Sequence, residues 1–209
     1  DYEKKKNEVF SINSWGKGLK QLTHLGGTIL SATWSPRGDK IVFNFRKSQS
    51  DTMQLYIMNP DGTDITKIST NDERSYSQPA WSPDGKKIAF TSYGENISSG
   101  RERYQTIFVM NIDGSNEVQL ISDPPKNIEG DHSPSWSPDG AKIAFASYKK
   151  SWQSEIFLIN ADGTEQEQLT TMEHYLSGPS WSPDGKFIVF VKGWQNGTDI
   201  FRMDSDGTN

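Results

Sequence analysis

The chain has 209 residues, a formal net charge of −5, a hydrophobic content of 33% and no cysteine. The acidic balance argues against a nucleic-acid partner, which would require a basic surface, and the absence of thiols excludes disulfides and thiolate chemistry. No apolar run approaches the roughly 18–20 residues of a membrane span. No signal peptide or initiator Met is present, so we expect the chain to begin as a mature or excised protein would.

The first residues differ in character from the rest. Residues 1–8 form a charged lead-in, which we expect to be a solvated terminus. Residues 9–13 and 19–23 each have the composition of a short strand, and the turn between them contains Gly16 and Gly18. The sequence therefore predicts a strand pair before the first repeat.

One stretch then occurs four times. It is Trp-Ser-Pro-x-Gly followed by an apolar triplet, and the copies begin at Trp34, Trp81, Trp136 and Trp181, with spacings of 47, 55 and 45 residues. Each copy contains a strand that ends at the Trp, a turn of Ser-Pro-Asp-Gly composition and a continuous apolar strand. A third strand and an Asp-Gly turn follow, and then a fourth strand, which is clearest at residues 65–68, 118–121 and 168–170. No helical periodicity of useful length appears. Four short antiparallel strands per ~45 residues are typical of a propeller blade.

The motifs of this unit resemble those of a known family. Trp-Ser-Pro-Asp-Gly-Lys-Lys-Ile-Ala-Phe, followed by Ile-Phe-Val-Met-Asn-x-Asp-Gly and Gln-Leu, is similar to the WD40-like blade of the TolB family. Similar blades occur in prolyl oligopeptidase relatives and some polysaccharide lyases. The resemblance covers residues 9–209 and implies an all-β propeller of four-stranded antiparallel blades, usually with six or more blades in TolB relatives. We expect residues 9–209 to form a single β-propeller domain or a partial propeller.

The number of strands favours part of a larger propeller. The expected strands form an N-terminal pair, three units of four and a last unit of three. A small closed ring, or self-association through unpaired terminal strands, is the alternative. The first repeat also departs from the others, because Arg37 replaces Asp and Ala32 replaces Pro. We expect that blade to pack less regularly.

Strand alternation assigns each loop to one of two ends of a blade. The Ser-Pro-Asp-Gly and Asp-Gly turns fall on one end, which we call the framework-turn end. The loops at 46–54, 92–105, 147–154 and 192–198, with the connections into each first strand, fall on the other, the variable-loop end. Variable loops on a rigid scaffold commonly carry binding residues. The candidate binding residues there are Arg74, Tyr76, Arg101, Arg103, Tyr104, Asp131, His132, Trp152, His174, Tyr175 and Trp194.

Chemistry at this end is less clearly indicated than binding. We expect Tyr93 and Tyr148 to cap the blade core. Asp131-His132 is the best candidate for proton chemistry near neutral pH, although a solvated or hydrogen-bonded loop histidine is the favoured interpretation. The three histidines lie at unequal offsets from the next Trp, which neither shows nor excludes a metal site. No nucleophile elbow, phosphate loop or zinc motif is present, and the Asp-Gly turns fit hairpins better than calcium loops. We predict no catalytic residue, metal or cofactor.

Three functional hypotheses remain. The first, implied by the TolB resemblance, is a non-catalytic scaffold that binds protein or peptide partners in the bacterial cell envelope, in a periplasmic or extracellular location. The second is a carbohydrate-binding or polysaccharide-lyase-like protein that takes a glycan at the variable-loop end. The third is a structural fragment of a larger multidomain protein.

Overall fold

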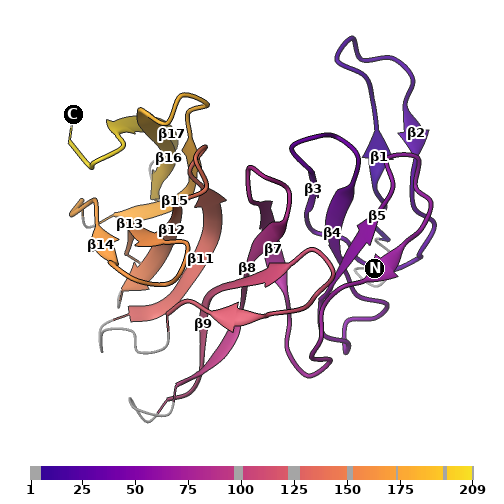
Figure 1. Ribbon diagram of the computed structural model, residues 1–209, viewed down its shortest axis with the longest axis horizontal. Coiled ribbons are helices and arrows are strands. Elements are labelled where there is room, and N and C mark those ends of the chain that lie inside the picture. The colour runs from indigo at the N-terminus through magenta and orange to yellow at the C-terminus, as the bar shows by residue number, and fades with distance from the viewer. Residues whose placement is uncertain are drawn as a thin grey trace. The chain divides into compact units, whose positions relative to one another are not determined.

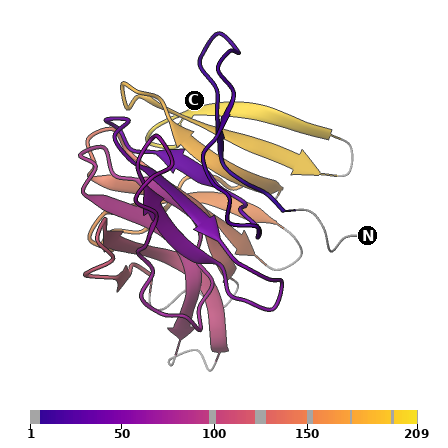
Figure 2. The same cartoon turned by 90° about the vertical axis from the view of Figure 1, so that its right-hand side faces the viewer.

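The computed structural model describes residues 6–96, 101–121, 128–149, 153–172, 174–194 and 197–208, which contain seventeen strands and no helix (Figures 1 and 2). Accordingly, these residues include no helix long and apolar enough to cross a membrane. The chain divides into two compact units, Asp1–Pro79 and Ala80–Asn209.

Unit 1 contains a hairpin and a four-stranded sheet. In the hairpin, β1 (Phe10–Ser11) pairs with β2 (Lys20–Gln21). The antiparallel sheet has the order β3 (Ala32–Trp34), β4 (Ile41–Phe45), β5 (Gln54–Met58) and β6 (Thr66–Lys67). Its core contains Val9 and Leu22 next to Phe43 and Met58, so the hairpin segment and the sheet share one apolar cluster.

Unit 2 contains the other strands. The first set is β7 (Ser77–Trp81), β8 (Lys87–Asn96), β9 (Arg101–Asn111) and β10 (Val118–Gln119). The second is β11 (Ile128–Trp136), β12 (Lys142–Lys149), β13 (Ser154–Asn160) and β14 (Glu167–Gln168). The third is β15 (Tyr175–Trp181), β16 (Phe187–Trp194) and β17 (Gly197–Asp204). A single parallel bridge between Gly130 and Gln105 joins the first two sets. The grouping of two, four, four, four and three strands confirms the predicted all-β class of propeller-type repeats.

Both faces of the second set are covered, which explains the continuous apolar runs. One face packs against the first set, and this cluster includes Ile143, Phe145, Phe157 and Ile159 with Ala89, Ile107 and Val109. The opposite face packs against the third set through Ala144, Ala146, Ile156 and Leu158 with Ile188, Phe190 and Met203. Adjacent side chains of a strand point to opposite faces, so a strand between two sheets needs apolar residues at every position.

The Asp-Gly turns interlock neighbouring sheets. A Cβ on Gly62 would lie 2.3 Å from the carbonyl oxygen of Leu22, and one on Gly163 would lie 3.0 Å from that of Leu120. Both leucines belong to the Gln-Leu pair one repeat earlier. Glycine is therefore required because the backbone of the preceding repeat passes directly over the turn.

The first repeat keeps the turn despite its departures. In unit 2, Ser137 Oγ donates a hydrogen bond to Asp139 at 2.6 Å. In the first repeat, Ser35 Oγ donates to Asp39 at 2.7 Å, so Asp39 replaces the carboxylate that Arg37 lacks.

Ala32 has a different effect. The repeats with proline at this position have a positive φ just before it, as at Ser133 (57°), whereas β3 pairs with β4 without a register shift. The expected irregularity is therefore not found in this strand pairing.

Three of the predicted loops are shorter than expected. Ladder pairing continues to Asn96 and Arg101 in the β8–β9 hairpin, and to Trp194 and Gly197 in the β16–β17 hairpin. Strand β12 likewise extends to residue 149. The prediction of loops over 92–105, 147–154 and 192–198 was wrong because backbone pairing does not stop where the apolar side chains end.

Candidate functional site

The variable-loop end of unit 2 brings together several residues that the sequence singled out. Asp131 and His132 lie on β11, Tyr104 on β9 and Tyr175 on β15. Their contacts form two groups. Asp131 bonds Thr106 and Ser147, and Tyr104 bonds Thr106; His132 stacks on Tyr148, which bonds Tyr175. We call the set the polar cluster; its members are Tyr104, Thr106, Asp131, His132, Ser147, Tyr148 and Tyr175.

Asp131 is a buried carboxyl group with two hydroxyl partners. Its side chain is 1% exposed. Ser147 Oγ donates to Oδ1 at 2.6 Å and Thr106 Oγ1 donates to Oδ2 at 3.2 Å. Burial raises the pKa of Asp131 to about 6, since desolvation outweighs the two hydrogen bonds that lower it. The group therefore changes charge at mildly acidic pH.

Repeat comparison explains why this carboxyl group is there. Directly before the apolar core of the third strand, three other repeats carry an acid or amide that accepts a hydrogen bond from a Thr or Ser hydroxyl. These are Glu8 from Thr23 at 2.6 Å, Gln54 from Ser69 at 2.6 Å and Glu155 from Thr170 at 2.5 Å. The equivalent residue in the first set of unit 2 is Thr106. Asp131 reaches Thr106 from the neighbouring strand set and supplies the missing carboxylate. The sequence signal for this site is therefore Thr106, a hydroxyl residue where those repeats carry an acid or amide.

His132 has one ring nitrogen bonded and one without a partner. Nδ1 lies 3.0 Å from Ser133 Oγ, whereas Nε2 is buried and has no hydrogen-bond partner among the described residues. Burial lowers the pKa of His132 to about 4, so the imidazole is neutral at pH 7. The register shift between His132 and Ser135 forms a bulge, a feature that commonly re-aims side chains near functional sites. Nε2 therefore has a hydrogen-bonding capacity that no described residue fills.

Two tyrosines extend the cluster. The rings of His132 and Tyr148 are stacked with centroids 4.3 Å apart. Tyr148 donates a hydrogen bond to the Tyr175 hydroxyl at 3.2 Å. Burial, reinforced by Tyr175, raises the pKa of Tyr148, so the Tyr148 hydroxyl keeps its proton at neutral pH. Tyr148 contacts polar partners here, in addition to any role in capping the blade core.

The other candidate residues lie apart from the cluster or outside the described part. In unit 1, Tyr76 is fully buried and its hydroxyl accepts a hydrogen bond from the Asn71 amide at 3.1 Å. The Arg74 carbonyl accepts one from Gln54 at 3.0 Å. In unit 2, His174 is exposed and its carbonyl accepts from Ser154 N at 2.9 Å. The remaining candidates have no described side chain: Arg101 and Arg103 on β9, Trp194 on β16, and Trp152.

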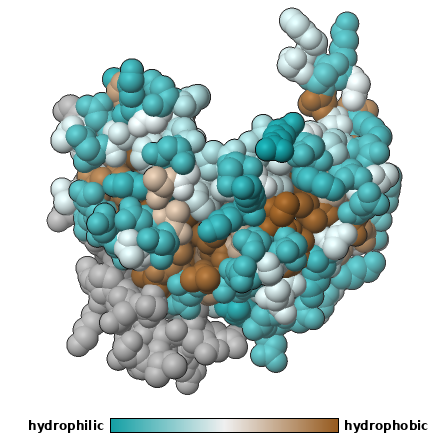
Figure 3. Space-filling view, in the orientation of Figure 1, coloured by the Kyte–Doolittle hydropathy of each residue, from teal (hydrophilic) through white to brown (hydrophobic). Residues whose placement is uncertain are grey.

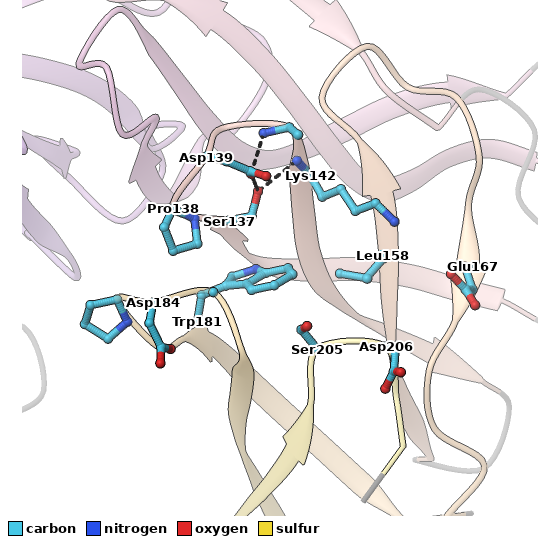
Figure 4. Close-up of a pocket in the computed structure, with 13 residues that line it drawn as sticks. Ser137, Pro138, Asp139, Lys142, Leu158, Glu167, Trp181, Asp184, Ser205 and Asp206 are labelled. Atoms are coloured by element: carbon cyan, nitrogen blue, oxygen red, sulfur yellow. Dashed lines mark hydrogen bonds between the residues drawn. The ribbon is translucent and has the colours of Figure 1, made fainter.

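A concave site also exists at the framework-turn end of unit 2, where the sequence predicted none (Figure 4). It is a pocket of about 460 Å³. The indole of Trp181 lies between the turn at residues 137–142 and that at 183–185, with Leu158 on the far side. The lining contains Asp139, Glu167, Asp184 and Asp206 but one lysine, Lys142. Electrostatically, the pocket favours cations. No group of three or more metal-ligating side chains occurs in the described ranges.

The fold and the repeats define a propeller-type repeat protein, and the comparisons identify the family. The family model for the TolB beta propeller domain matches residues 96–209. The chain therefore belongs to the TolB β-propeller family.

Individual relatives are consistent with this assignment. An uncharacterized protein of Agrobacterium fabrum is 31% identical over 68% of this chain and 49% of its own length. The Tol-Pal system protein TolB of Nitratidesulfovibrio vulgaris is 28% identical over 69% of this chain and 29% of its own. A solved TolB-type structure from Agrobacterium tumefaciens has a TM-score of 0.74 at 23% identity and covers 97% of this chain and 78% of that one. The chain thus spans half or less of the length of these two curated relatives.

Proposed function

We propose that the chain is a non-catalytic TolB-type scaffold that binds a protein partner in the bacterial cell envelope through the variable-loop end of unit 2. The observation that carries the proposal is the buried, neutral imidazole of His132, whose Nε2 has no partner among the described residues. An unsatisfied buried polar atom costs about 1–3 kcal/mol. A ligand that supplies the missing hydrogen bond recovers that free energy.

The neighbouring groups favour a polypeptide as the ligand. The hydroxyl groups of Tyr148 and Tyr175 and the imidazole provide hydrogen-bonding groups of both kinds next to aromatic surface, a combination enriched at protein interfaces. They lie on paired strands, which hold them more rigidly than a free loop would. The relatives named as Tol-Pal system proteins support the envelope location and make a Pal protein the first partner to test.

The test is a binding titration of the purified chain with the soluble Pal domain of a relative such as that of N. vulgaris. We expect Tyr175→Phe and His132→Phe each to weaken binding about fivefold to thirtyfold, because each removes one hydrogen-bonding group from the interface. Trp194→Ala and Trp152→Ala extend the scan to the rest of the variable-loop end.

Asp162→Asn is the matched control at the framework-turn end, where Asp162 is exposed and caps its own turn. It should leave binding unchanged. The proposal fails if the chain binds no envelope protein. It also fails if only framework-turn variants, such as those in the Trp181 pocket, reduce binding.

A further inference from the structure

The turn of the β1–β2 hairpin has the backbone bonds of the later Asp-Gly turns but lacks their Asp. The Asn13 amide donates to the Lys17 carbonyl and the Gly16 amide to the Asn13 carbonyl, both at 3.0 Å. The turn between β5 and β6 has the same two bonds, from Asn59 and Gly62. Trp15 therefore occupies the position at which the four later turns carry Asp61, Asp113, Asp162 and Asp206.

The indole of Trp15 is not needed to close this turn. In the later turns the aspartate is the cap, as when Asp61 Oδ1 accepts from Thr63 N at 3.0 Å. In the first hairpin the cap comes from Asn13, whose Oδ1 accepts from Trp15 N at 3.1 Å and Lys17 N at 2.8 Å. The hairpin thus keeps its geometry without any contribution from the Trp15 side chain.

Trp15 is also exposed to an unusual degree. Its side chain is 85% exposed, at the tip of a hairpin that projects from the surface of unit 1 (Figures 1 and 3). The equivalent Asp61, Asp113 and Asp162 are exposed too, although each lies between the third and fourth strands of a complete four-stranded set. Exposure is therefore a property of this turn position. Phe10, Ile12 and Leu19 of the same hairpin are exposed as well, and a group of exposed apolar side chains suggests an external contact.

The charge around the tip indicates what that contact is. Residues 9–23 contain Lys17 and Lys20 but no Asp or Glu, in a chain whose net charge is −5. Lys20 Nζ also reaches the Asp61 carbonyl oxygen at 3.0 Å, while the Asp61 carboxylate is engaged by its own turn. Leu19, next to Lys20, is 68% exposed. The tip is convex and combines an indole, an aliphatic side chain and two ammonium groups.

We propose that residues 13–20 dock on an anionic lipid surface. Trp15 and Leu19 enter the boundary between headgroups and acyl chains, where an amphipathic indole is favoured. Lys17 and Lys20 contact the phosphate groups. A protein partner of acidic character would need a concave surface to receive the tip, whereas a bilayer accepts a convex one without prior complementarity.

The experiment is co-sedimentation of the full chain with vesicles of equal parts phosphatidylglycerol and phosphatidylcholine, and with pure phosphatidylcholine vesicles, at low salt. Trp15→Asp installs the residue of the four later turns, so folding should be kept, which an unchanged denaturation midpoint verifies. We expect it to reduce partitioning about tenfold, as for a large apolar side chain that loses its burial. Lys17→Gln should reduce partitioning about fivefold, and added salt should weaken it.

Val118→Glu is the matched control. Val118 is 53% exposed, and the equivalent residue one repeat later is Glu167, so this variant also changes an exposed apolar residue to an acid found in a sister repeat. It should leave partitioning unchanged. The proposal is overturned if the wild type does not sediment with anionic vesicles, if Val118→Glu matches Trp15→Asp, or if the tip binds an acidic peptide in solution in preference to vesicles.

Discussion

Replacement of Asp131 by Asn tests whether ionisation of this buried carboxyl group of the polar cluster lowers the stability of the folded protein. Ser147 can still donate to the amide oxygen, and the amide nitrogen can donate to Thr106, so the variant resembles the protonated acid. A pKa raised from its ordinary 3.8 to about 6 corresponds to about 3 kcal/mol of lost stability when the group is ionised.

The direction of this pKa change determines how the stability of the protein depends on pH. The pKa of Asp131 is higher in the folded state than in the unfolded state, so its stabilising contribution is present below pH 4 and is lost as the pH rises through 6. Asp131→Asn should therefore match the wild type near pH 4. It should be more stable by about 3 kcal/mol at pH 7 and above.

The assay is urea unfolding of both proteins at half-unit intervals from pH 4 to pH 8, followed by tryptophan fluorescence. The difference in the free energy of unfolding between the two proteins isolates Asp131, because all other groups titrate in both. A difference that does not change with pH would refute the reasoning. So would a variant that is less stable than the wild type at pH 8.

Three further predictions concern other parts of the structure. His132→Phe keeps the ring stack on Tyr148 but removes a group whose pKa burial lowers to about 4. The stability of this variant relative to the wild type should therefore rise by about 3 kcal/mol as the pH falls from 7 to 4. The same unfolding assay measures this. Gly62→Ala should lower the free energy of unfolding by about 3 kcal/mol, because the new Cβ would meet the Leu22 carbonyl. Gly16→Ala should lower it by about 1 kcal/mol, because a Cβ at Gly16 would have nothing within 4 Å. Equal losses in thermal or urea unfolding would contradict the interlock between repeats. Trp136→Phe removes the 3.2 Å hydrogen bond from the indole nitrogen to the Ala80 carbonyl. The indole nitrogen of Trp181 has no partner among the described residues. Trp136→Phe should therefore lower the free energy of unfolding by about 1 kcal/mol more than Trp181→Phe does.

The sequence predicted the repeats well because the framework is local. The turn after each Trp depends on residues that are two to five positions apart, such as Ser137 with Asp139 and Lys142. The same turn survives in the first repeat because Asp39 replaces the carboxylate that Arg37 lacks. Short-range chemistry of this kind can be recognised from spacing alone.

The polar cluster was harder to predict because its contacts are long-range. Asp131 and its partner Thr106 are 25 residues apart, and their contact depends on how two strand sets meet at Gly130. The polar run Gly-Asp-His-Ser has the composition of a solvated loop, yet Asp131 and His132 are almost fully buried on β11. Strand lengths were underestimated for a related reason: polar residues such as Thr106 continue the ladder beyond the apolar core.

The framework turns hold the repeats together, and we propose that binding occurs at the opposite end of unit 2. The sharpest test is amide hydrogen exchange of the chain with and without the Pal domain. We expect new protection at the start of β11 and β15 and at the end of β12, around His132, Tyr148 and Tyr175, with exchange at the Ser-Pro-Asp-Gly turns unchanged. Protection confined to those turns, or to the Trp181 pocket, would contradict it.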